Sequence, residues 1–215
     1  MNMEQLRYNM VEQQIRPWNV LDLKVLSLLD KVKREQYVPT TCRELAFMDI
    51  EIPLGHGVSM WQPKLEARAV QALQLKPRDR VLEIGSGCGY LTALISQLAE
   101  HVTSVEIVPG LLAFAERNLA AHHIDNIMLI QGDAAQGWPG EYDAIVLTGS
   151  VPVLPETFKN SLKPGGRLFA IIGDAPAMHA TLVTRLASGE FESVILFETV
   201  VAPLQNALQP ERFVF

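Results

Sequence analysis

Val81-Leu82-Glu83-Ile84-Gly85-Ser86-Gly87-Cys88-Gly89-Tyr90 reads as an apolar strand that runs directly into three alternating glycines, with a helical pattern following. Glycine permits a tight turn from strand to helix, and it lets a ligand approach the backbone closely. Many glycine-rich turns are only turns. The meaning of this segment therefore depends on what surrounds it.

Short apolar segments alternate with helical patterns on both sides of this turn. Strands are expected at 80–84, 102–107, 127–131, 144–147 and 167–172, and helices at 64–75, 89–99, 110–122 and 155–161. Residues 181–187 and 191–201, joined by a turn at 188–190, predict a final antiparallel hairpin. The alternation predicts a Rossmann-like α/β fold, with a doubly wound, mostly parallel sheet of about seven strands.

The first part of the chain has a different pattern. Residues 5–36 carry apolar side chains at helical spacing, and residues 37–63 contain prolines and glycines with little periodicity. We therefore expect a helical and lid-like extension over 1–63, followed by one compact core over 64–215. Lys31, Lys33 and Arg34 are interpreted as a solvated helix face.

Composition excludes several classes of protein. The 215 residues carry a formal charge of −6, and no basic stripe suits a nucleic acid. No apolar run reaches the roughly 18–20 residues that span a bilayer, and the N-terminus lacks a secretory pattern. Cys42 and Cys88 have no metal-like spacing, which predicts no metal site and a reducing compartment. These features predict a cytoplasmic protein without nucleic-acid or membrane partners, and they leave the oligomeric state open.

Polar residues end several expected strands. Glu106 follows the glycine turn at the spacing of about 20 residues where an acidic side chain accepts hydrogen bonds from ribose. Asp133 is placed to accept from the amino group of adenine, although it also suits a helix cap or turn. Thr148 ends a strand where the reactive end of a cofactor would lie. Open α/β sheets bind ligands at this edge.

The glycine spacing indicates which adenosine cofactor is bound. In the dinucleotide pattern G-x-G-x-x-G, the third glycine would fall at Tyr90, and no G-K-[ST] phosphate loop occurs. The pattern E-x-G-x-G-x-G is instead expected for S-adenosylmethionine, which has no phosphate.

From about Met10 to Leu204, the chain resembles the protein-L-isoaspartate O-methyltransferases. The resemblance rests on a set of short motifs. They are Met10–Ile15, Arg34–Pro39, Pro53–Gly57, Glu83–Tyr90, Gly132-Asp133, Gly137-Trp138, Tyr142–Ile145 and Leu162–Leu168.

The resemblance implies methyl transfer from S-adenosylmethionine to the free α-carboxylate of L-isoaspartyl residues in proteins or peptides, the first step of their repair. A carboxylate is already ionised at neutral pH, so this reaction needs alignment rather than a general base. The expected cofactor-binding residues are Glu83, Gly85, Ser86, Gly87, Glu106, Asp133, Ala134 and Thr148, with Gly85, Ser86 and Gly87 at the methionine part of the cofactor. Ser59 is the candidate catalytic residue beside the acceptor, and Ser59 and Trp61 are the candidate substrate-binding residues.

One motif departs from the family. The family signature Q-T-I-S-Q-P is Val58-Ser59-Met60-Trp61-Gln62-Pro63 here, so the family's serine falls at Trp61. Ser59 keeps a hydroxyl, but positions two apart in an extended chain lie about 6.5–7 Å apart, too far for a simple replacement. Trp61 is either a tolerated core residue or a sign of changed acceptor specificity.

Two rival hypotheses follow from this departure. One is a methyltransferase for a different, small-molecule acceptor, with Trp61 as a pocket wall. The other is a cofactor-binding protein that acts through a protein partner without transferring methyl groups.

Overall fold

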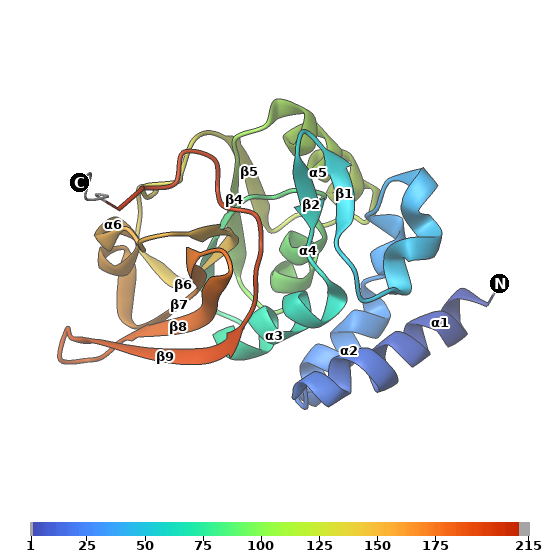
Figure 1. Cartoon of the computed structure of the whole chain (residues 1–215), viewed down its shortest axis with the longest axis horizontal. Coiled ribbons are helices and arrows are strands. Elements are labelled where there is room, and N and C mark those ends of the chain that lie inside the picture. Colours follow the sequence, from blue (N-terminus) through green and yellow to red (C-terminus); the bar gives the residue numbers. More distant parts are fainter. Residues whose placement is uncertain (1, 211–215) are drawn as a thin grey trace.

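The computed structural model, which describes residues 2–210, contains a seven-stranded sheet with the order β5-β4-β3-β6-β7-β8-β9 (Figure 1). Its strands are β3 (Arg80–Ile84), β4 (His101–Glu106), β5 (Ile127–Gln131), β6 (Tyr142–Val151), β7 (Leu162–Asp174), β8 (Ala177–Arg185) and β9 (Phe191–Glu198). Pairing is parallel from β5 to β7 and antiparallel from β7 to β9. This confirms the predicted mostly parallel sheet with an antiparallel hairpin at its end.

Helices cover both faces of the sheet. They are α3 (Pro63–Leu73), α4 (Tyr90–Ser96), α5 (Pro109–Ala121) and α6 (Glu156–Asn160). Because successive strand residues point to opposite faces, Val81 joins the core formed with α3, α4 and α5. Leu82 joins a second core on the other face, with Phe158 of α6.

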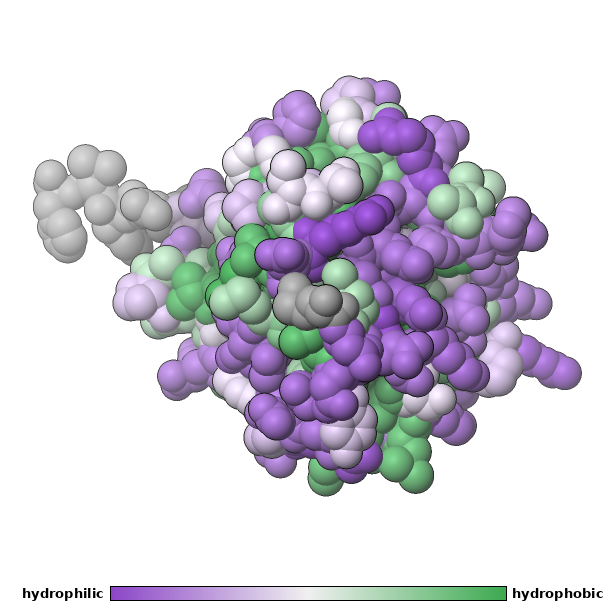
Figure 2. Space-filling model, turned by 90° about the vertical axis from the view of Figure 1, so that its right-hand side faces the viewer, coloured by the Kyte–Doolittle hydropathy of each residue, from purple (hydrophilic) through white to green (hydrophobic). Residues whose placement is uncertain are grey.

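The N-terminal segment packs onto the face that α3, α4 and α5 cover, and Met10, Ile15 and Leu29 are buried in the same core. It contains α1 (Met3–Met10), a π-helical turn (Val11–Ile15), a 3-10 turn (Arg16–Trp18), α2 (Leu23–Lys31) and a 3-10 turn (Arg34–Gln36). Figure 2 shows that this side of the molecule is mainly hydrophilic. The division of the chain after residue 63 stays a prediction.

The prediction of a solvated face at Lys31, Lys33 and Arg34 was wrong for one of its members. Lys31 and Lys33 are not buried, but Arg34 is only 1% exposed. Its charge is compensated by Glu66 of α3, a residue distant in sequence that a local pattern does not reveal.

The segment 37–63 is more regular than expected. It contains a 3-10 helix (Thr40–Phe47) and an antiparallel hairpin of β1 (Ile52–Gly55) and β2 (Val58–Met60). Gly55, His56 and Gly57 all have positive φ angles at the tip of the hairpin. Strands of three or four residues are too short to show an alternating pattern, which is why the sequence did not reveal them.

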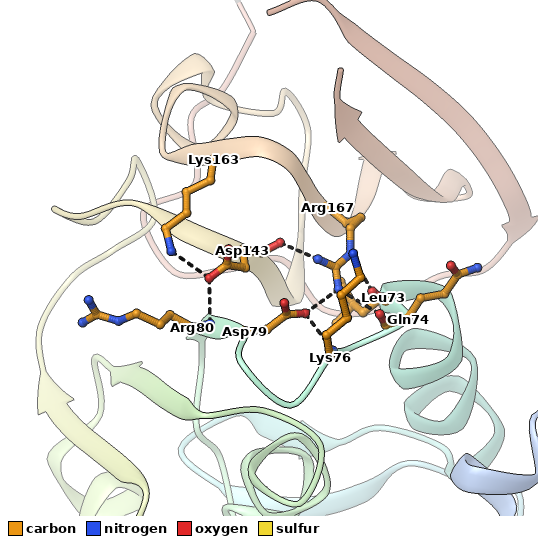
Figure 3. Close-up of polar contacts among 8 residues, drawn as sticks. All are labelled: Leu73, Gln74, Lys76, Asp79, Arg80, Asp143, Lys163 and Arg167. Atoms are coloured by element: carbon orange, nitrogen blue, oxygen red, sulfur yellow. Dashed lines mark hydrogen bonds and ion pairs between the residues drawn. The ribbon is translucent and has the colours of Figure 1, made fainter. Parts of the chain in front are cut away.

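A charged cluster holds the amino edge of the sheet (Figure 3). Arg167 donates hydrogen bonds to the carbonyls of Leu73, Gln74 and Asp143, and to the carboxylate of Asp79 at 2.6 Å. Lys163 pairs with Asp143 at 2.8 Å. The cluster therefore ties α3, β6 and β7 together at the edge opposite the carboxyl ends of the strands.

Among residues 2–210, none of the helices combines the length and apolarity that crossing a membrane requires.

Candidate functional site

A pocket opens at the carboxyl ends of β3, β4 and β6, where the sequence places the ligand. Residues of the glycine turn, the β1–β2 hairpin, the start of α3 and the chain after β9 all line it. The residues that line it include 57–61, Glu66, 84–88, 105–107, 132–135, 148–149 and 201–205.

The glycine turn requires glycine for two reasons. Gly85, Gly87 and Gly89 have φ angles of +95°, +55° and +82°, which side chains rarely adopt. A Cβ atom at Gly85 would also lie 2.2 Å from Oγ1 of Thr148. The Thr148 hydroxyl lies 2.8 Å from the carbonyl oxygen of Ile84 and lines the pocket.

Glu106 is held rigidly at the pocket. Its Oε2 accepts a hydrogen bond from the backbone N–H of Gly87, and its Oε1 accepts from that of Val108, both at 2.9 Å. The residue is 4% exposed and lines the pocket. Each carboxylate oxygen has further acceptor capacity, so this geometry suits a ligand that offers two neighbouring hydroxyls, such as ribose.

Asp133 and Ala134 lie on the same wall. Asp133 Oδ1 accepts from the backbone N–H of Ala135 at 3.1 Å, so the residue also makes the local turn that its sequence suggested. Its Oδ2 accepts from the amide of Asn206 at 2.7 Å. Ala134 is buried and lines the pocket. No sequence pattern predicts this contact between Asn206 and Asp133.

Glu83 lies behind the glycine turn rather than on the pocket surface. It is fully buried, and its Oε2 accepts from the hydroxyls of Thr92 and Ser104. Ser104 also bonds Ser86, which does line the pocket. Burial raises the pKa of Glu83 to about 7, although both hydroxyl donors oppose the shift. Glu83 therefore supports the turn through Ser104.

Trp61 both packs in the core and borders the pocket, and a changed acceptor specificity stays a prediction. It is 6% exposed, and its ring packs edge-on against Phe169 at 6.3 Å between centroids, as a core residue would. It also lines the pocket beside Ser59. Its backbone carbonyl accepts a hydrogen bond from Nη2 of Arg34 at 2.5 Å. Ser59 is half-buried and pairs with Pro53 in the hairpin.

The chain after β9 forms a wall that sequence reasoning missed. The backbone N–H of Ser150 bonds the carbonyl of Ala202 at 3.0 Å, and the N–H of Leu204 bonds the carbonyl of Ser150 at 2.9 Å. These bonds add residues 201–205 to the end of β6, beside the pocket.

Two other types of chemistry find no support in this pocket. Burial is the main cause that raises the pKa of Cys88 to about 12, so its thiol stays protonated and is a poor nucleophile. Within residues 2–210, no cluster of three or more His, Cys, Asp or Glu side chains is placed to hold a metal ion.

The pocket fits S-adenosylmethionine. The side-chain-free turn admits a ligand against the backbone, the Glu106 carboxylate offers acceptors for ribose, and Asp133 lies on the neighbouring wall.

Comparison with known proteins agrees with this arrangement. Residues 5–209 match the family model described as protein-L-isoaspartate(D-aspartate) O-methyltransferase. A protein-L-isoaspartate O-methyltransferase 1 of Rhodopseudomonas palustris (strain HaA2) is 39% identical over 201 residues, which are 92% of this chain and 82% of the relative. A protein-L-isoaspartate O-methyltransferase of R. palustris (strain ATCC BAA-98 / CGA009) is 38% identical over 94% of this chain and 95% of the relative.

A solved structure has the same fold. It is a Plasmodium falciparum chain described as a protein-L-isoaspartate O-methyltransferase in complex with S-adenosyl-L-homocysteine. The TM-score is 0.78, with 24% identity over 95% of this chain and 98% of that chain.

Proposed function

The chain belongs to the protein-L-isoaspartate O-methyltransferase family and is an S-adenosylmethionine-dependent methyltransferase, and from this premise we propose that it methylates the free α-carboxylate of L-isoaspartyl residues in proteins and peptides. The observation that carries the proposal is one pocket that is lined both by Glu106 and the glycine turn and by Ser59 and Trp61.

The chemistry needs little from the protein beyond placement. S-adenosylmethionine supplies a methyl group on a sulfonium: the carboxylate oxygen forms the new O–CH₃ bond, the C–S bond breaks, and its electron pair stays on sulfur. The charges of carboxylate and sulfonium cancel, so no proton moves. A carboxylate with a pKa near 4 is already a nucleophile at neutral pH.

The residues of the chain then align the reactants and exclude water. The glycine turn and Glu106 fix the cofactor end, and the hydroxyl of Ser59 is the candidate hydrogen-bond donor to the acceptor carboxylate. Trp61 and the segment 201–205 also line this pocket.

We also propose a cytoplasmic location and protein substrates rather than nucleic acids. Support comes from the two free cysteines, of which Cys88 is buried and Cys42 half-buried, and from the acidic net charge of −6.

The test is labelled methyl transfer to an isoaspartyl peptide beside its normal aspartyl twin, with the wild type and Trp61→Ser. We expect the wild type to label only the isoaspartyl peptide, with base-labile esters. If only Trp61→Ser labels it, the natural acceptor is a different molecule. If neither variant labels it while S-adenosyl-L-homocysteine still binds, repair methylation is rejected.

A further inference from the structure

Glu66 places a carboxylate in the pocket wall that the function described so far does not use. It lies in the first turn of α3, its side chain is 4% exposed, and it lines the pocket. Charged side chains are seldom buried to this extent without a partner.

Arg34 holds one oxygen of this carboxylate in place. Its Nη1 pairs with Oε2 of Glu66, its Nε donates to the carbonyl of Ala46 at 3.0 Å, and its Nη2 donates to that of Trp61. The guanidinium lies 5.3 Å from the centre of the Tyr90 ring. Arg34 does not line the pocket itself, but Glu66, Trp61 and Tyr90 all do. It lies directly behind this wall and fixes three of its members.

The second oxygen of Glu66 is free. No hydrogen bond from residues 2–210 reaches Oε1. This atom is also accessible to solvent. A fixed acceptor with unused capacity therefore remains on the pocket wall. A ligand that offers an N–H donor would satisfy it.

The position of Glu66 indicates which part of the ligand it meets. Arg34, which pairs with Glu66, also lies 5.3 Å from the centre of the Tyr90 ring, and Tyr90 follows the glycine turn directly. Glu66 and residues 85–88 line the same pocket. The turn is also where the methionine part of the cofactor is expected.

Charge then selects the partner. The acceptor of the proposed reaction is a carboxylate, which a free carboxylate oxygen would repel. The methionine part of S-adenosylmethionine carries an α-ammonium group, a cation with three N–H donors. Burial raises the pKa of Glu66 to about 8 against the opposing charge of Arg34, so a second cation beside it would stabilise its ionised form.

We propose that Oε1 of Glu66 binds the α-ammonium group of the cofactor, and that Arg34 is the positioning residue that aims it. The inference rests on the proposed function only for the identity of the cofactor. It adds a cofactor-binding residue from α3, outside the glycine turn and the strand ends.

Two related ligands separate this role from a general structural one. S-adenosyl-L-homocysteine carries the α-ammonium group, whereas 5′-methylthioadenosine lacks the amino-acid part and keeps adenine and ribose. Calorimetry would measure the affinity of each for the wild type and for Glu66→Gln, which keeps the size of the side chain but not its charge. The matched control is Glu12→Gln, which changes a half-buried acid that also pairs with an arginine but does not line the pocket.

We expect Glu66→Gln to lower the affinity for S-adenosyl-L-homocysteine about tenfold and to leave the affinity for 5′-methylthioadenosine almost unchanged. The reason is that a charge-assisted hydrogen bond is lost from one ligand only. Glu12→Gln should not alter the ratio of the two affinities. Arg34→Lys should show the same selective loss to a smaller degree. Equal losses for both ligands, or no loss for either, would overturn the proposal.

A double variant separates a loss of ligand binding from a loss of the folded pocket. Arg34→Met combined with Glu66→Leu replaces the buried pair by apolar side chains, a change that buried ion pairs often tolerate. Its retained affinity for 5′-methylthioadenosine would show an intact pocket, and the selective loss of S-adenosyl-L-homocysteine should persist. Both measurements are independent of the peptide-labelling assay, so failure of the repair activity and failure of this inference are distinguishable.

Discussion

At the amino edge of the sheet, the guanidinium of Arg167 donates to three carbonyls and to Asp79, and Asp143 receives Lys163. At the carboxyl edge, Glu106 is as deeply buried as Asp79, but it borders a pocket and its partners are only two backbone N–H groups. Both edges bury charge. One edge satisfies it within the chain, and the other leaves acceptor capacity for a ligand.

The pKa values follow the same division. Burial acts to raise the pKa of Asp143, but hydrogen bonds from Lys163 and Arg80 outweigh it and hold the pKa below its ordinary value. Glu83, behind the pocket, has only hydroxyl partners, so burial prevails and raises its pKa to about 7. At the amino edge, cationic and N–H donors stabilise the ionised form of Asp143. Near the carboxyl edge, Glu83 has no cationic partner, so its neutral form is favoured.

The largest expected effect comes from breaking the charged cluster at the amino edge of the sheet. Arg167→Met should lower the free energy of unfolding by about 3–5 kcal/mol, because the buried Asp79 carboxylate loses its charged partner and keeps only the backbone N–H of Lys76, and three carbonyls lose a donor. Urea unfolding would measure the loss, with Arg80→Met, an exposed neighbour, as control. The folded variant should keep its affinity for S-adenosyl-L-homocysteine. Lost affinity with normal stability would contradict a purely structural edge.

At the carboxyl edge, we expect a substitution to change ligand affinity. Glu106→Ala removes two acceptors for ribose. It should weaken the binding of S-adenosyl-L-homocysteine by about 2–3 kcal/mol, which is roughly a 100-fold higher dissociation constant. Glu116→Ala, an exposed acid of α5, is the control. Calorimetry tests the change, and an unaltered dissociation constant would remove the ribose assignment.

A smaller effect should distinguish the edges by pH. A carboxyl group with a raised folded-state pKa contributes stability below its unfolded-state pKa, and this contribution is lost as pH rises through the folded-state value. For Glu83 the loss should be about 1 kcal/mol between roughly pH 6 and pH 8. Glu83→Gln does not titrate, so urea unfolding across this range should show a shallower decline than the wild type. Parallel curves would mean that Glu83 does not titrate there.

Asp143 should act with the opposite sign. Its lowered pKa contributes stability at neutral pH, and that contribution is lost only as pH falls through the folded-state value in acid.

Much of the ligand edge was predictable because strand ends and glycine turns are local features. The segment 81–90 and the acids at 106 and 133 lie where an α/β pattern places them, and the structure brings them to one pocket. Glu83 belongs to the same motif but faces away from the pocket surface. A strand alternates its faces, and only the finished sheet determines which face meets the ligand.

The contacts that the sequence did not reveal join residues far apart in the chain. Arg34 reads as one of three cations on a helix face, yet it is buried against Glu66, 32 positions away. Asn206 meets Asp133 across 73 positions. The resemblance over Arg34–Pro39 was the one available signal for Arg34, but it carried no information on its partner.

The amino-acid sequence alone therefore specified the fold class, the cofactor and the strand ends that receive it. Hydrophobic periodicity and glycine spacing are properties of neighbouring residues, and they are written directly in the chain. The tertiary structure decided how Trp61 can be both core and pocket wall, which acids face the ligand, and which charges are paired. Those outcomes depend on burial and on long-range partners, and both arise only when the N-terminal segment, α3 and the chain after β9 close around the sheet.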